Sequence, residues 1–248
     1  MHQRLLRQCR KLHKAWVLSQ YSIEVYFCRK IIIMTTSEEN YIKVIYHLSI
    51  TSLEGVTTNA IAKAIQTKPS SVSDMLKKLS EKKAVSYKKY QGVTLTESGF
   101  QLAKMIVRKH RLWEVFLVEK LSFSWDEVHD IAEQLEHIKS ETLVNRLDKY
   151  LGFPTVDPHG DPIPNEQGVI KKRIKLLLSE AQLNQSYQCI GVKNSASDFL
   201  QYLDKHHIKL GTTLMVKERE LYDNTLLLEM DSKLITVSNK IATNLYVQ

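Results

Sequence analysis

Histidine and glutamate side chains recur at helical spacing in two segments of the chain. In residues 126–150, which the pattern predicts as one helix, four of them fall at i, i+4, i+7 and i+8 and share an arc of about 100°: His129, Glu133, Glu136 and His137. A second predicted helix, residues 97–119, carries the i, i+4 pair His110 and Glu114 beside an apolar row. Imidazole nitrogens and carboxylate oxygens on rigid helices are the ligands of a divalent transition metal. The spacing therefore predicts a metal site, with Mn²⁺ or Fe²⁺ favoured and Zn²⁺, Co²⁺ or Ni²⁺ able to bind in vitro.

The composition is that of an ordinary globular protein rich in helix. Of 248 residues, 43% are hydrophobic and 25% charged, with only 8 glycines and 5 prolines, which excludes collagenous and largely disordered proteins. The apolar runs are far shorter than the roughly 20 residues that cross a bilayer. Three cysteines without CxxC spacing suggest neither a disulfide framework nor a zinc knuckle. We therefore expect a cytoplasmic protein with no membrane partner.

The positive charge is concentrated at the start of the chain. Residues 1–33 hold seven Lys/Arg and one Glu, so they carry +6 of the net charge of +8. This stretch lacks the apolar core and small-residue cleavage site of a signal peptide. We expect the folded protein to begin at Met34 and residues 1–33 to be a basic extension outside the fold.

Residues 34–105 have the pattern of a winged helix-turn-helix. Helices are expected at 38–50, 58–65 and 70–82, followed by a hairpin turning at Tyr90–Gly92. Residues 68–89 carry seven lysines against Asp74 and Glu81, a local charge of +5 that suits phosphate contact. The residues expected at double-stranded DNA are Lys68, Ser70, Ser71, Ser73, Asp74, Lys77, Lys78, Lys88 and Lys89.

The remaining chain divides into a helical part and a β part. A proline-rich segment, residues 152–164, ends the predicted helix 126–150. After a basic helix or linker at 171–184 come short β runs at 187–192, 212–218, 225–230 and 233–238, with one helix at 198–206. This tail is typical of a small β-barrel.

Six segments in order resemble the diphtheria-toxin-repressor family of metal-dependent transcriptional regulators: EENYIKVIYHL, TKPSSVSDMLKKL, YKKYQGVTLTESG, MIVRKHRLWEVFL, VHDIAEQLEHIKSETL and PHGDPIP. The resemblance covers residues 34–248. It implies a mainly α fold with a small β domain: a winged helix (34–105), a helical metal-binding and dimerisation domain (106–172) and a C-terminal Src-homology-like β-barrel (173–248). It also implies a homodimer that represses metal-homeostasis genes by binding a double-stranded DNA operator.

The resemblance assigns ligands to two metal positions. Residues matching His110, Glu114 and His129 hold an ancillary metal, and those matching Glu133, Glu136 and His137 hold a primary one with Asn40 from the first helix. The barrel lends Asp198 to the ancillary metal. Glu133 stands where iron-responsive members carry Cys, which favours Mn²⁺. Against that, Asn40 and Lys43 stand where manganese-responsive members carry acids, so the choice between the two metals stays open.

The mechanism expected is metal-activated repression, fading below about pH 6 because coordination needs neutral imidazoles. Two alternatives remain: a di-metal hydrolase, and a winged helix whose second domain is purely structural. The hydrolase explains the cluster but not the winged helix, and no further base or nucleophile motif accompanies it. We therefore expect no enzyme and no small organic substrate.

Overall fold

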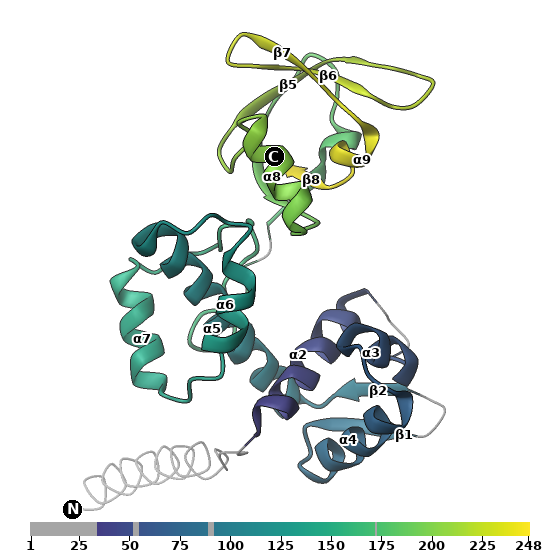
Figure 1. Cartoon of the computed structure of the whole chain (residues 1–248), viewed down its shortest axis with the longest axis vertical. Coiled ribbons are helices and arrows are strands. Elements are labelled where there is room, and N and C mark those ends of the chain that lie inside the picture. The colour runs from purple at the N-terminus through teal and green to yellow at the C-terminus, as the bar shows by residue number, and fades with distance from the viewer. Residues whose placement is uncertain (1–33, 52–54, 89–91, 172) are drawn as a thin grey trace, which may run out of the picture. The chain divides into compact units, whose positions relative to one another are not determined.

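The structure is a computed structural model that describes residues 34–51, 55–88, 92–171 and 173–248 (Figure 1). The basic extension expected at residues 1–33 and the predicted DNA contact Lys89 lie outside these ranges. In the described part of the chain, no helix has both the length and the apolar character needed to span a membrane.

The first described elements form a winged helix-turn-helix, as the sequence predicts. They are α2 (Thr36–Thr51), α3 (Thr58–Ile65), α4 (Pro69–Glu81), β1 (Val85–Lys88) and β2 (Gly92–Leu95). The Thr57 side chain accepts a hydrogen bond from Ala60 N at the start of α3, and left-handed Gln66 ends that helix. The strands pair antiparallel from Val85 opposite Leu95 to Lys88 opposite Gly92. Buried aliphatic residues of the three helices form the core: Ile42, Ile45, Ile61, Val72, Leu76 and Leu79.

Helix α5 (Glu97–Leu121) is continuous from the wing to the candidate site. It packs against α2 and β2 and also against α6 (Val128–Leu135) and α7 (Glu141–Tyr150). The boundary expected after residue 105 therefore falls inside one helix. Its first turn is close to the backbone of Ala84: a Cβ added at Gly99 would lie 1.9 Å from the Ala84 carbonyl oxygen. Glycine at this position therefore permits the close approach of α5 to the wing.

The prediction of a single helix over 126–150 is wrong, because the segment forms two helices, α6 (Val128–Leu135) and α7 (Glu141–Tyr150). Glu136 is the C-cap of α6, and Ser140 starts α7 by accepting a hydrogen bond from Leu143 N. The apolar periodicity continues through the break and hides it, although Ser140 followed by Glu141 is a helix-start signal. Glu136 and His137 therefore lie in a turn and not on a helix face.

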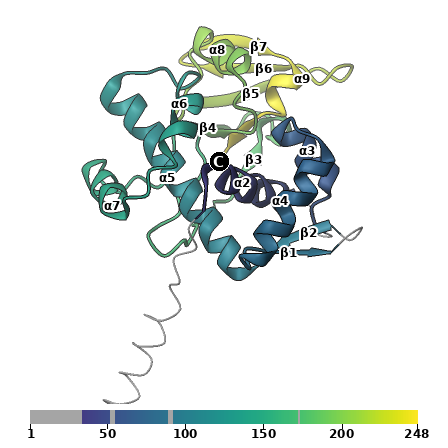
Figure 2. The same cartoon turned by 60° about the horizontal axis from the view of Figure 1, so that its bottom comes forward.

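The C-terminal part is one six-stranded antiparallel sheet in the order β3-β8-β4-β5-β6-β7. Residues 171–184, expected as a helix or linker, contain a short strand and one 3-10 turn. The elements are β3 (Leu176–Leu177), η1 (Leu178–Glu180), β4 (Ser186–Val192), α8 (Ser197–Lys205), β5 (Thr213–Arg219), β6 (Leu226–Met230), β7 (Lys233–Val237), α9 (Asn239–Ala242) and β8 (Leu245–Val247). Helices α8 and α9 lie against this sheet (Figures 1 and 2) and contribute Phe199, Leu200, Leu203, Ile241 and Ala242 to its core. Trp125, from the loop before α6, also belongs to that core.

Candidate metal centre

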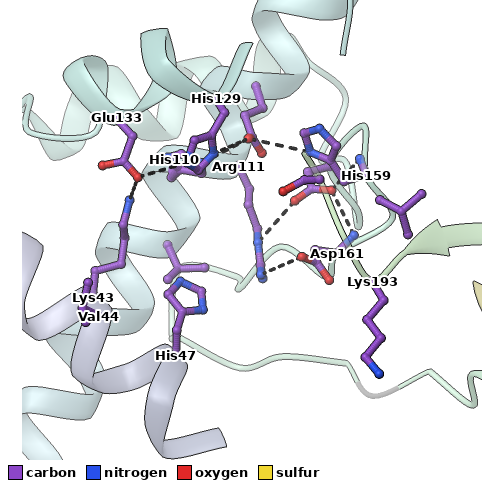
Figure 3. Close-up of a pocket in the computed structure, with 15 residues that line it drawn as sticks. Lys43, Val44, His47, His110, Arg111, His129, Glu133, His159, Asp161 and Lys193 are labelled. Carbon is purple, nitrogen blue, oxygen red and sulfur yellow. Dashed lines mark hydrogen bonds and ion pairs between the residues drawn. The ribbon is translucent and has the colours of Figure 1, made fainter. Parts of the chain in front are cut away.

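A cavity of about 320 Å³ is lined by titratable side chains from α2, α5, α6, the proline-rich segment and the residue that follows β4, Lys193. Figure 3 shows Glu133, His110 and His129 on one side of it and His159 and Asp161 on the other, with Arg111 between them. Helices α5 and α6 pack against each other, which brings together residues that the sequence placed on two separate stripes.

His110 bridges two buried carboxylates. Its Nδ1 lies 2.7 Å from Glu136 Oε2, and its Nε2 lies 3.0 Å from Glu114 Oε1. Burial opposes protonation of the ring, but the hydrogen bonds with Glu114 and Glu136 outweigh it and raise the pKa of His110 to about 9. The ring is therefore an imidazolium at neutral pH. Proton competition with a metal thus begins well above the pH 6 expected from an ordinary histidine.

His129 completes the group of predicted ancillary ligands. Its Nδ1 lies 3.7 Å from Glu114 Oε1 and its Nε2 lies 3.5 Å from Glu133 Oε1. One ligand atom each from His110, Glu114 and His129 falls within 4.8 Å of the others. Burial would raise the pKa of Glu114, but its hydrogen bonds with the surrounding histidines lower it far below the usual range. Glu114 is therefore ionised, as a metal ligand must be.

Helix α2 faces the other end of the cluster. Glu39, only 6% exposed, lies 2.6 Å from His137 Nδ1 through Oε2, and Lys43 Nζ donates to Glu133 and to Glu136. Sequence reasoning missed Glu39, although it immediately precedes the predicted ligand Asn40. Its role depends on α2 lying opposite α6, which local periodicity does not reveal.

Two buried oxygens at this end have no hydrogen-bond partner in the described residues: Asn40 Oδ1 and Glu136 Oε1. His137 Nε2 lies 3.8 Å from the same Glu136 oxygen. A buried carboxylate oxygen without a partner is costly unless a cation satisfies it. The donor set of amide oxygen, carboxylate oxygen and imidazole nitrogen therefore fits a divalent ion.

Asp157 and His159, in the proline-rich segment 152–164, were not assigned a role from the sequence. Together with Glu114 they form a third group whose ligand atoms lie within 4.8 Å of one another. His159 Nε2 donates to the Trp125 carbonyl oxygen at 2.9 Å, which leaves Nδ1 facing Glu114 Oε1 at 3.7 Å. A backbone acceptor on one ring nitrogen is the usual way to orient the other as a ligand.

Burial raises the pKa of Asp157 to about 7, and the Glu114 charge adds to this effect. Arg111 opposes it, with Nε 3.3 Å from Asp157 Oδ2 and a second nitrogen 3.5 Å from Asp161. Arg111 thus holds the acidic turn of the proline-rich segment against α5.

The structure does not bring Asp198 into the cavity. This side chain is exposed at the start of α8 and accepts a hydrogen bond from Phe199 N. The C-terminal domain instead contributes Val192, Lys193 and Ser195 to the cavity lining. Among these three side chains, the one oxygen donor is the Ser195 hydroxyl.

The predicted DNA-binding residues gather on α4 and the wing. Lys68, Ser70, Ser71, Asp74, Lys77, Lys78 and Lys88 are exposed. Ser73 instead donates to the Pro69 carbonyl oxygen at 3.1 Å, and Lys77 pairs with Asp74 at 3.1 Å. Most of the predicted set is thus accessible to a nucleic acid, whereas the Ser73 hydroxyl is already used by its own helix.

Comparison with protein families matches three models in sequence order. Residues 33–93 match the iron dependent repressor N-terminal DNA binding domain, and residues 96–165 match the iron dependent repressor metal binding and dimerisation domain. Residues 176–248 match the FeoA domain.

Individual relatives agree with these models. The chain is 35% identical over 133 residues to the iron-dependent repressor IdeR of Mycobacterium tuberculosis, covering 53% of this chain and 56% of that protein. It is 34% identical over 119 residues to the regulator MntR of Oceanobacillus iheyensis, covering 48% and 80%. A solved manganese-dependent transcriptional repressor in complex with manganese aligns with a TM-score of 0.74 and 34% identity, over 85% of this chain and 98% of that one. On the evidence of fold, site and sequence together, the chain belongs to the iron-dependent repressor family of metal-dependent transcriptional regulators.

Proposed function

We propose that this protein is a homodimeric, metal-activated repressor that binds a double-stranded DNA operator and controls metal-homeostasis genes. The observation that carries the proposal is a cluster of imidazoles and carboxylates joining α2 of the DNA-binding region to α5 and α6. Its two unpartnered buried oxygens, on Asn40 and Glu136, come one from each side of that junction.

The contacts support two metal positions. In the primary one, Asn40, Glu136 and His137 supply ligand atoms, and Glu39 orients the His137 ring by its hydrogen bond. Glu133, expected as a further primary ligand, instead contacts the Lys43 ammonium. The ancillary one uses His110, Glu114 and His129, with Asp157 and His159 on its far side. A divalent ion bound at either position supplies positive charge that neutralises the converging carboxylates.

Packing between neighbouring helices connects the metal cluster to the predicted DNA-binding surface. Asn40 lies on α2, which packs against α3, while α3 packs against α4. Fixing α2 against α6 therefore fixes the exposed face of α4, where Ser70, Ser71 and Lys78 lie. In a dimer this sets the distance and direction between two recognition helices, which a two-fold symmetric operator requires.

An exposed apolar surface supports the homodimer. Leu121 at the end of α5, Leu143 and Tyr150 on α7, and Phe153 just after it are 41 to 66% exposed. The aromatic ring of Tyr150 lies 6.5 Å from that of Phe116 on α5, so the two helices share this surface. Exposed apolar side chains in a regulator's dimerisation domain are suited to an isologous interface.

The ligand chemistry favours Mn²⁺ or Fe²⁺. Every donor in the cluster is nitrogen or oxygen, and the one cysteine in the described residues, Cys189, is buried in the core of the C-terminal domain. Zn²⁺, Co²⁺ and Ni²⁺ also bind such donors in vitro. Relatives named for iron and for manganese are both similar to this chain.

The proposed role is regulatory and cytoplasmic, without catalysis, a small organic substrate or a membrane partner. A di-metal hydrolase needs an open coordination position together with a base for the attacking water. Here Glu114, Glu136 and Asp157 already contact His110, Lys43 or Arg111. These carboxylates are thus engaged in the packing of the helices and are not available as that base. The division into domains at residues 105 and 172 is part of the same proposal.

The decisive test is a DNA-binding titration of the full chain on promoter fragments of the source organism's metal-uptake genes. Parallel samples contain chelator, Mn²⁺, anoxic Fe²⁺ or Zn²⁺. We expect binding with Mn²⁺ or Fe²⁺ that chelator abolishes and that Glu136→Gln lacks. Glu119→Gln, an exposed carboxylate on α5, is the matched control and should bind normally. Equal binding with and without metal would reject metal activation and favour a structural role for the cluster.

A further inference from the structure

Lys43 places a positive charge inside the candidate metal centre. Its Nζ lies 2.5 Å from Glu133 Oε1 and 2.7 Å from Glu136 Oε2. The whole residue is 7% exposed, and Glu136 is fully buried. A buried ammonium that forms two short ion pairs is a fixed part of the cluster and not a solvated surface charge.

The Lys43 ammonium occupies a position whose surrounding donor atoms are close enough together to bind a metal ion. Ligand atoms of His110, Glu133 and Glu136 all lie within 4.8 Å of one another. Both carboxylates of this group already contact the Lys43 ammonium, and the His110 ring contacts the same Glu136 oxygen at 2.7 Å. A divalent ion placed among the three donors would meet the ammonium at close range and be repelled by it.

Glu136 separates this filled position from a second one. Its Oε2 accepts from Lys43 and from His110, whereas its Oε1 has no hydrogen-bond partner among the described residues and lies 3.8 Å from His137 Nε2. Asn40 Oδ1 is likewise buried without a partner. The Glu136 carboxylate thus accepts from the Lys43 ammonium through one oxygen, and its other oxygen is available to a metal ion.

We propose that Lys43 is a tethered cation that fills the position formed by His110, Glu133 and Glu136, so that this end of the cluster takes one divalent ion instead of two. The inference rests on the proposed function only in assuming that the cluster binds divalent metal. Lys43 belongs to α2 and its partners to α6 and its C-cap. Its ion pairs therefore join α2 of the winged helix-turn-helix to the metal domain before any metal binds.

The charge balance gives a direct test. Lys43→Glu changes the cluster by two negative charges, which equals the charge of one divalent ion, and adds a carboxylate ligand. Lys43→Gln removes the ammonium without adding a charge. Lys63→Glu makes the same charge change on the exposed surface of α3 and is the matched control.

The measurement is the number of Mn²⁺ ions bound per subunit of the full chain, from the free Mn²⁺ signal in electron paramagnetic resonance, checked by equilibrium dialysis with elemental analysis. We expect Lys43→Glu to bind one more Mn²⁺ per subunit than the wild type and Lys63→Glu to match the wild type. Lys43→Gln should also gain one ion, at higher Mn²⁺ concentration because it has one carboxylate fewer.

An unchanged count in folded Lys43→Glu and Lys43→Gln would overturn the inference. Circular dichroism checks the fold, and if Lys43→Glu does not fold, the count in Lys43→Gln decides. Failure of the proposed function has a different signature. Operator binding by the wild type would then be independent of metal, while the number of bound Mn²⁺ ions would still increase when Lys43 is replaced.

Discussion

The protonation of His110 predicts how strongly pH controls metal binding. With a pKa of about 9 in the metal-free protein, about 97% of the rings carry the second proton at pH 7.5, against about 10% for an ordinary histidine of pKa near 6.5. A ligand nitrogen must be unprotonated. Each metal ion that binds through His110 therefore releases nearly one proton from this ring at pH 7.5.

The same competition sets the affinity. For a pKa of about 9, lowering the pH from 8.5 to 6.5 weakens binding at His110 about 80-fold, whereas a pKa of 6.5 gives about twofold. This corresponds to a loss of about 2.6 kcal/mol of binding free energy. Asp157, with a pKa raised to about 7, would strengthen the effect in the same direction if it also binds the ion.

Calorimetric Mn²⁺ titrations at pH 6.5, 7.5 and 8.5 measure this affinity, and buffers of different ionisation enthalpy give the number of protons released. An NMR titration of the metal-free protein reports the His110 pKa directly. Glu119→Gln, an exposed change on the same helix, should alter neither result. Glu114→Gln removes one of the two carboxylates on the ring and should lower the His110 pKa. A wild-type midpoint below pH 7, or an affinity change of only a few fold, would refute the reasoning.

Four further outcomes are expected. Because a raised histidine pKa stabilises the fold below pH 6.5 and loses that contribution as pH rises through about 9, denaturant melts of the metal-free protein should show a loss of up to about 3 kcal/mol across this range. Gly99→Ala, which drives a Cβ into the Ala84 carbonyl oxygen, should lower stability by about 1–3 kcal/mol in the same melts. Lys78→Ala should reduce the salt dependence of DNA binding by about one ion, measured by fluorescence anisotropy, with Lys233→Ala as an unaffected control. Tyr150→Glu should shift the dimer to monomer in sedimentation experiments, and an unchanged dimer would exclude α7 from the interface.

The sequence predicted the elements whose signals are local. Helices α2, α3 and α4, the wing strands and the start of α5 lie close to their expected positions. Local signals act there within a few residues: the caps at Thr57 and Thr96 and the αL residue Gln66. The break at Glu136 was missed because the apolar period continues across it. The periodicity thus predicted the histidines and glutamates of α5 and α6 as a cluster, but it did not predict the turn that directs Glu136 inward.

Long-range pairing could not be predicted in this way. The opposition of Lys43 to Glu133, and of Glu39 to His137, requires α2 to lie beside α6, some 90 residues later in the chain. Asp157 lies in a loop without periodicity. The signal available for it was chemical: an aspartate and a histidine flank a proline in a segment already singled out.

Asp198 lies outside the cavity. The C-terminal domain therefore influences the metal centre by contacts other than the predicted ligand. Trp125 packs in that domain's core, donates from Nε1 to Asp204 at 2.9 Å, and stacks on the His159 ring with planes 8° apart. The Trp125 carbonyl oxygen also accepts from His159 Nε2. On the other side, Gly160 lies so close to β4 that a Cβ would meet the Ile190 carbonyl oxygen at 2.1 Å. The domain therefore acts on the cluster by holding the His159 ring, with Nδ1 toward Glu114, and a ring fixed in this way loses less entropy when it binds an ion than an exposed aspartate would.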